Sequence, residues 1–256
     1  WYNAVDNSLK FTFDYNAWSA GGNLNTARPM LAGLGAQNAA LVFGGHAPGN
    51  LNNSEEYNGS SWTEGDNLNT ARTRLAGAGT QNAGLGFGGY ISDDSALTEA
   101  YNGTSWSEVG DLNTAREQGA GGGTSNTEAI CFGGGTPADM NAGSQLTETW
   151  NGSSWSEVGD LNILKIYGGG FGSTPSAVAC GSYNPSPSNW ANVEEWNGSS
   201  WSEVANLANG RYFTNGGSGT GSLGLLAGGQ QGPGVTNMNN TEEWTKSPGV
   251  ETISTT

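Results

Sequence analysis

The 256-residue sequence is poor in the residues on which most enzymes and nucleic-acid-binding proteins depend. It has one histidine, two cysteines and 8 Lys and Arg residues against 23 Asp and Glu residues, which gives a formal net charge of −15. Because so few basic residues cannot neutralise a row of phosphates or bind anionic lipid, we expect neither a nucleic-acid partner nor a membrane-surface one. No apolar run approaches the roughly 20 residues that span a bilayer, so we expect no membrane insertion.

Catalytic motifs are also missing. The single histidine, His46, excludes multi-histidine metal sites and most histidine-based triads, and the sequence has no CxxC, HExxH, GxSxG or Walker motif. Cys131 and Cys180 lie in successive repeats. We favour two buried free thiols. A disulfide bridge between them is the alternative if their Cα atoms lie within about 7 Å. The sequence therefore predicts that the protein is not an enzyme and holds no cofactor.

Glycine and tryptophan, by contrast, are plentiful, and they recur periodically. Five segments read almost alike: SEEYNGSSWTE, TEAYNGTSWSE, TETWNGSSWSE, VEEWNGSSWSE and a degraded TEEWTKSPG. Their central aromatic residues are 44 to 49 positions apart, and FDYNAW near the N-terminus is a sixth, partial copy. A period of this length with short strands is typical of a propeller blade rather than a helical solenoid.

Each repeat has the same internal order. A linker such as LNTAR ends in a basic residue, a glycine follows five positions later, and a short apolar strand then ends in Gly-Gly in most copies. Asn-Gly between flanking aromatic residues predicts a tight hairpin, because such turns need positive φ. Each unit is thus expected to form four short antiparallel strands.

The ordered signature of Arg, Gly, Gly-Gly, Glu-x-aromatic and Trp resembles the kelch repeat over essentially the whole chain. In that family the glycine doublet ends the second strand, Glu-x-Tyr lies on the third and Trp on the fourth. The sequence departs from the pattern in a shorter aromatic-to-Trp spacing and in the missing Trp of the last copy. The resemblance implies an all-β fold, a single kelch-like β-propeller.

We predict one propeller domain over residues 1–256 with six blades, five blades being the alternative. Residues 1–21 are expected to supply strands of the closing blade, and residues 250–256 its innermost strand. Between them lie the five repeats, at about 22–65, 66–110, 111–159, 160–205 and 206–249.

One acidic and one basic residue recur in every unit, which predicts structural ion pairs between strand and linker. The basic members are Arg28, Arg72, Arg116, Lys165 and Arg211, and the acidic ones are Glu55, Glu99, Glu148, Glu194 and Glu242. A ring of arginines that binds an anion is disfavoured, because matched glutamates would neutralise it. A second set of glutamates follows each Trp and is expected to form a solvated rim, with Ca²⁺ binding as the less favoured reading: Glu64, Glu108, Glu157 and Glu203.

Other recurring positions are expected to be structural. The repeated aromatic residues should fill the space between blades. The recurring glycines should lie on the innermost strand, where a missing Cβ permits close backbone approach at the axis: Gly33, Gly77, Gly121, Gly170 and Gly216.

Variation between the copies is concentrated in the loops after the glycine doublets, at roughly 46–54, 90–97, 135–146, 182–192 and 230–240. A constant framework with changing loops is typical of a scaffold that presents them for binding. The candidate contact residues on these loops are His46, Tyr90, Tyr183 and Trp190.

The near-identical copies, together with the opening WYNAVDNSLKF, also resemble repeat proteins predicted in tailed phages of aquatic bacteria. That resemblance implies a virion structural, decoration or tail-associated host-attachment protein, located in the virion. Its partners would be other virion proteins or a glycan or protein of the host surface, and homo-oligomers are possible. The alternative is a secreted or cell-surface bacterial adhesin or filament subunit, and a glycan-active enzyme is the third and least favoured hypothesis.

Overall fold

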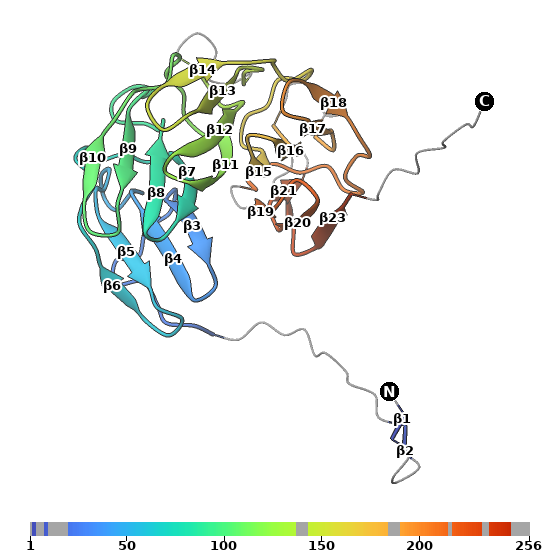
Figure 1. The fold of residues 1–256 in the computed structure, drawn as a ribbon, viewed down its shortest axis with the longest axis horizontal. Helices are drawn as coiled ribbons and strands as arrows, with labels where there is room; N and C mark the ends of the chain where they lie inside the picture. The colour runs from blue at the N-terminus through green and yellow to red at the C-terminus, as the bar shows by residue number, and fades with distance from the viewer. Residues whose placement is uncertain are drawn as a thin grey trace.

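In the computed structural model the described residues are 2–3, 8–9, 20–136, 143–183, 190–214, 217–231 and 236–246. These residues form strands and turns and no helix. Five antiparallel sheets, the blades, are arranged around a common axis (Figure 1). The all-β propeller expected from the sequence is therefore present.

The strands follow one another from the axis outwards in each blade. The innermost strands are β3 (Ala32–Ala36), β7 (Ala76–Thr80), β11 (Ala120–Ser125), β15 (Gly169–Ser173) and β19 (Gly217–Gly219). The second strands are β4 (Ala39–Phe43), β8 (Ala83–Phe87), β12 (Glu128–Phe132), β16 (Ser176–Cys180) and β20 (Leu223–Ala227). The third strands are β5 (Ser54–Tyr57), β9 (Thr98–Tyr101), β13 (Thr147–Trp150), β17 (Val193–Trp196) and β23 (Thr241–Thr245). The fourth strands are β6 (Trp62–Glu64), β10 (Trp106–Glu108), β14 (Trp155–Glu157) and β18 (Trp201–Glu203).

The Asn-Gly turns join the third and fourth strands as predicted. At the first of them Gly59 has a φ of 93°. The Asn58 side chain accepts hydrogen bonds from the backbone N–H groups of Ser60 and Ser61, each at 3.0 Å. Glycine supplies the positive φ and asparagine closes the loop, so this dipeptide sets the strand register in which Tyr57 faces Trp62.

A contact between a phenylalanine ring and a tryptophan ring joins neighbouring blades at three interfaces. The ring of Phe43 on blade 1 lies 4.8 Å from Trp106 on blade 2, and Phe87–Trp155 and Phe132–Trp201 repeat this pair at 4.9 Å. The indole N–H of Trp155 also donates to the Thr98 hydroxyl at 2.9 Å. Each tryptophan is therefore a core residue of the blade interface, as the sequence suggested.

The recurring glycines have a different role from the one expected. A Cβ on Gly121 would lie 2.6 Å from the Phe87 ring, and one on Gly170 would lie 2.4 Å from the Phe132 ring. These glycines make room for the phenylalanine of the preceding blade, and not only for backbone approach at the axis. No described phenylalanine precedes Gly33 in the chain, and a Cβ on Gly33 would have no atom closer than 3.6 Å. Gly216 lies outside the described residues.

The ring has five blades, so the six-blade prediction was wrong and the five-blade alternative is correct. A sixth blade required strands from residues 1–21 and 250–256. The described strands there, β1 (Tyr2–Asn3) and β2 (Ser8–Leu9), pair with each other and join no blade (Figure 1). The closing strand predicted at 250–256 lies outside the described residues.

Blade 5 differs from the others because it has three strands in the described part of the chain, β19, β20 and β23. A short hairpin of β21 (Gln230–Gln231) and β22 (Thr236–Asn237) interrupts it. Between blades 4 and 5 lies a cavity of about 250 Å³, lined in part by Cys180 and Val193. At these two positions blades 1 to 3 have Phe, and Thr or Ser, respectively.

Among the described residues no helix has the length and apolar character needed to cross a membrane.

Candidate binding site at the collar

Buried ion pairs tie each linker to its blade. The distances are 2.7 Å for Arg28–Glu55, 3.0 Å for Arg72–Glu99 and 2.5 Å for Arg116–Glu148, and Arg211–Glu242 forms a fourth close pair. The carboxylate of Glu55 also accepts the backbone N–H of Asn25 at 2.7 Å. The structure thus brings the predicted partners together inside the blades, where they fix the linker. Glu242 also lines the cavity between blades 4 and 5.

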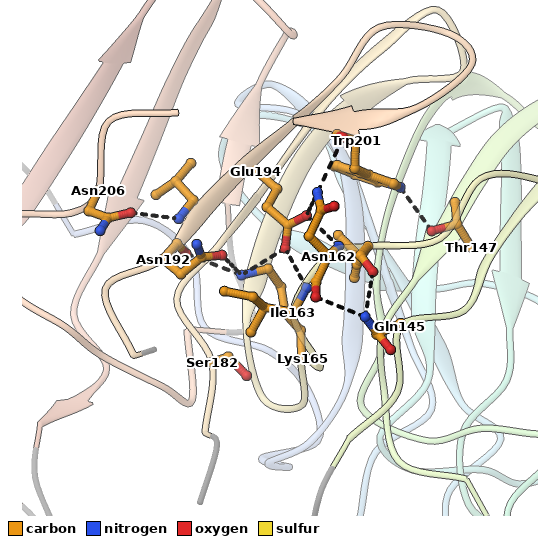
Figure 2. A network of polar contacts seen from close by, with 12 residues as sticks. Gln145, Thr147, Asn162, Ile163, Lys165, Ser182, Asn192, Glu194, Trp201 and Asn206 are labelled. Atoms are coloured by element: carbon orange, nitrogen blue, oxygen red, sulfur yellow. Dashed lines mark hydrogen bonds and ion pairs between the residues drawn. The ribbon is translucent and has the colours of Figure 1, made fainter. Parts of the chain in front are cut away.

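Blade 4 has the variant pair, in which lysine replaces arginine (Figure 2). The Lys165 ammonium donates to the Asn192 side-chain oxygen at 2.8 Å and lies 3.9 Å from Glu194. Burial lowers the pKa of Lys165 to about 8, partly offset by the negative charge of Glu194. The Lys165 ammonium lacks the guanidinium fork of an arginine and lies too far from Glu194 for a hydrogen bond, so Asn192 accepts one from it instead.

A second repeated feature is a ring of residues in the left-handed backbone conformation, which we call the collar. It consists of the residue two positions after each linker base, with φ between 54° and 60°: Met30, Arg74, Gln118, Tyr167 and Phe213. The N–H of Arg74 donates to the Met30 carbonyl and the N–H of Gln118 to the Arg74 carbonyl, both at 2.9 Å. The collar lies where the linkers enter the innermost strands, at one end of the central channel.

The channel itself is narrow, with a cavity volume of about 100 Å³. Arg74 and Gln118 of the collar line it together with glycines of the inner strands. A space of this size holds a few water molecules and no larger ligand. The surface around the collar is therefore the better candidate for a binding site than the channel.

The loops after the glycine doublets lie at the same end of the ring, because the second strand of a blade runs back towards the linker. The residue after each doublet is hydrogen-bonded to the residue before the collar, as in Tyr90 N–H to the Thr73 carbonyl at 2.7 Å and Tyr183 N–H to the Ile166 carbonyl at 2.9 Å. The collar and these loops form one continuous surface, which we call the collar face.

Three of the four candidate contact residues present side chains on this face. His46 and Tyr90 line a depression of about 320 Å³ together with Met30 and Arg74, and Tyr183 is 37% exposed. Trp190 is only 7% exposed and lies with its ring centroid 6.2 Å from that of Tyr183. Trp190 therefore supports the surface from beneath and is not itself exposed for contact.

Arg74, which lines the depression, has charged and aromatic partners. The Arg74 guanidinium makes two hydrogen bonds of 2.9 Å to the buried Glu117 carboxylate and lies over the Tyr90 ring at 5.7 Å. Burial raises the pKa of Asp94 to about 6, and the carboxylates of Glu117 and Asp93 add to this while Arg74 opposes it. A carboxyl group with a perturbed pKa beside a specific charged partner is a mark of functional sites.

The sequence alone did not reveal the collar. Its five members share a backbone conformation and a fixed offset from the basic residue of the linker. Their side chains differ in chemistry, so a comparison of residue types between the repeats does not identify them. The fixed offset is the signal that could have found them. Asp94 and Glu117 were missed because they come from different repeats.

The remaining predicted residues lie elsewhere. Glu64, Glu108, Glu157 and Glu203 are exposed on the fourth strands, each paired in register with the buried glutamate of the third strand. The described residues contain no group of three or more His, Cys, Asp or Glu side chains placed to hold a metal ion. Cys131 and Cys180 are buried free thiols.

Comparison with known proteins supports the fold and leaves the family open. No family model and no curated protein sequence matches this chain. Among solved structures it is similar to the one titled "Structure of YjhT", with a TM-score of 0.73 over 90% of this chain and 85% of that one. The two sequences are 12% identical, so the likeness shows the propeller fold alone.

Proposed function

We propose that this protein is a non-enzymatic propeller scaffold that binds its partner through the collar face. The observation that carries the proposal is the contrast between a constant backbone and variable side chains. All five collar residues hold the same left-handed conformation, yet they are methionine, arginine, glutamine, tyrosine and phenylalanine. A left-handed conformation is costly for such residues, and strain of this kind persists mainly where it serves function.

Exposed apolar side chains support the same face. Among the described residues five large apolar side chains are exposed, and four of them lie on the collar or the adjoining loops: Met30, Ile91, Tyr183 and Phe213. Gathered apolar groups on an otherwise polar, acidic protein mark an interaction site. The opposite end of the ring carries the Asn-Gly turns, which are nearly identical in sequence between blades.

The biological setting that we propose is the virion of a tailed phage, as a structural, decoration or tail-associated host-attachment protein. The near-identical repeats and the opening WYNAVDNSLKF support it. A secreted or cell-surface bacterial adhesin or filament subunit is the second candidate. Mass spectrometry of purified virions should find the chain in stoichiometric amounts. Its absence from virions together with its recovery from the bacterial surface would favour the second candidate.

The role of the collar face can be tested by a paired comparison. Tyr90→Ala combined with Tyr183→Ala should abolish attachment to host cells or assembly into particles. Thr104→Ala combined with Ser199→Ala, in two Asn-Gly turns at the opposite end, should leave both unchanged. Loss of attachment or assembly in the second variant, or none in the first, would contradict the proposal.

A further inference from the structure

One part of the collar face is aromatic. The Tyr167 and Phe213 rings lie 4.4 Å apart at adjacent collar positions, and Tyr183 lies 6.4 Å from Tyr167. Phe213 is 46% exposed and Tyr183 37% exposed, while the rings of Tyr212 and Trp190 support them from beneath. We call Tyr167, Tyr183 and Phe213 the aromatic platform. A phenylalanine half exposed at φ 54° contributes little to a core.

The neighbouring part of the collar face is polar and has unsatisfied hydrogen-bonding atoms. The described part of the chain offers no hydrogen-bond partner to four buried atoms there: Arg74 Nε, both carboxylate oxygens of Asp94, and Gln118 Oε1. These are one donor and three acceptors. Unpaired buried polar atoms are rare in native proteins, and they point to a ligand or ordered water that completes them.

The two parts are adjacent. Gln118 and Tyr167 occupy consecutive collar positions, on blades 3 and 4. Because Gln118 and Tyr167 are consecutive collar residues, a ligand that spans these two positions would contact both parts.

We propose that the collar face of blades 2 to 5 binds a neutral carbohydrate, with one sugar ring stacked on the aromatic platform. This inference rests on the proposed function and names the class of partner. The C–H face of a pyranose ring suits the negative face of an aromatic ring. A sugar hydroxyl both donates and accepts a hydrogen bond, so it suits a site that offers an unsatisfied donor beside unsatisfied acceptors.

Charge selects a neutral sugar over an acidic one. Arg74 is the only basic collar residue, and its guanidinium is already bound to Glu117 by two hydrogen bonds. Asp94 has no such partner in the described chain, and the protein as a whole carries a net charge of −15. A uronic or sialic acid carboxylate would therefore be repelled.

Native affinity electrophoresis can test this with defined probes. Gels would contain a neutral polysaccharide (dextran, mannan or β-glucan) or an acidic one (alginate or polysialic acid). We expect at least one neutral polysaccharide to retard the full chain and the acidic ones to leave it unretarded. Phe213→Gly, which removes the ring but keeps the backbone conformation, should weaken binding about tenfold or more, and Phe213→Tyr should retain it.

Leu223→Gly is the control, because it removes an exposed apolar side chain outside the collar face. It should bind as the wild type does, and circular dichroism should show all three variants folded. The inference would be overturned if no neutral polysaccharide retarded the protein, or if Phe213→Gly and Leu223→Gly lost binding equally. If attachment or assembly still depends on Tyr90 and Tyr183 in that case, the collar face binds a protein, so the proposed function stands without the sugar.

Discussion

At the residue scale, the buried ion pair is the unit that repeats in every blade. Arg72 and Glu99 have no exposed side-chain surface, and each makes further hydrogen bonds, such as that from Arg72 to the Gly88 carbonyl at 2.8 Å. Such a pair adds little net stability compared with an apolar pair, because both charges lose their hydration. Its effect is to hold each linker in one position on its blade, and so to place the collar residue that follows.

Removal of one partner should therefore be costly. Glu99→Ala leaves Arg72 buried without its counter-charge, and we expect the free energy of unfolding to fall by about 3–5 kcal/mol. Urea denaturation followed by tryptophan fluorescence measures it. Glu108→Ala, at an exposed fourth-strand position, should change the stability by less than about 0.5 kcal/mol. Equal effects of the two substitutions would show that the pair has no structural role.

Lys165 should make stability depend on pH. Burial lowers its folded-state pKa to about 8, whereas an unfolded lysine titrates near 10.4. Between these values the unfolded chain binds more protons, so stability relative to Lys165→Arg should rise with pH, by at most about 1.4 kcal/mol per pH unit. Below pH 8 the difference should be constant. Parallel stability curves for the two proteins from pH 7 to 10 would refute this.

At the scale of the strand, the fit between blades depends on a glycine that faces a phenylalanine. The pattern Phe87–Gly121 and Phe132–Gly170 explains why the glycine recurs on the inner strand of successive blades. It also explains the exception at the start of the chain, since Gly33 faces no described phenylalanine. The same interface changes between blades 4 and 5, where Cys180 replaces the phenylalanine and a cavity remains.

A pair of matched substitutions tests this packing. Gly121→Ala places a methyl group 2.6 Å from the Phe87 ring, and we expect a loss of about 1–3 kcal/mol in the free energy of unfolding. Gly33→Ala meets no atom within 3.5 Å, and it should leave the stability unchanged or raise it by up to about 1 kcal/mol. Thermal denaturation of the two variants should therefore show shifts of opposite sign or very different size.

At the scale of the whole molecule, negative charge dominates the surface. The net charge is −15, and five of the eight basic residues are bound in the linker ion pairs. The acidic rim of the fourth strands consequently has few cations near it. Mutual repulsion keeps such a protein soluble but works against its compact state.

Salt should therefore stabilise the protein. From about 10 mM to about 1 M ionic strength the Debye length falls from about 30 Å to about 3 Å, so the surface charges are screened while the buried pairs are largely unaffected. We expect the melting temperature to rise over this range. The rise should be smaller when Glu64, Glu108, Glu157 and Glu203 are all replaced by Gln. A melting temperature that falls with salt would indicate that exposed ion pairs stabilise the fold instead.

The sequence by itself determined the repeating unit: the four short strands, the Asn-Gly turns, the aromatic core and the partners of the ion pairs. These features are local or recur once per unit, so spacing along the chain is enough to read them. Only the tertiary structure decided the number of blades, the role of the glycines, the burial of Trp190 and the grouping of the collar residues with Asp94 and Glu117. The physical reason is that these depend on contacts between different repeats, which the periodicity of a single chain does not specify.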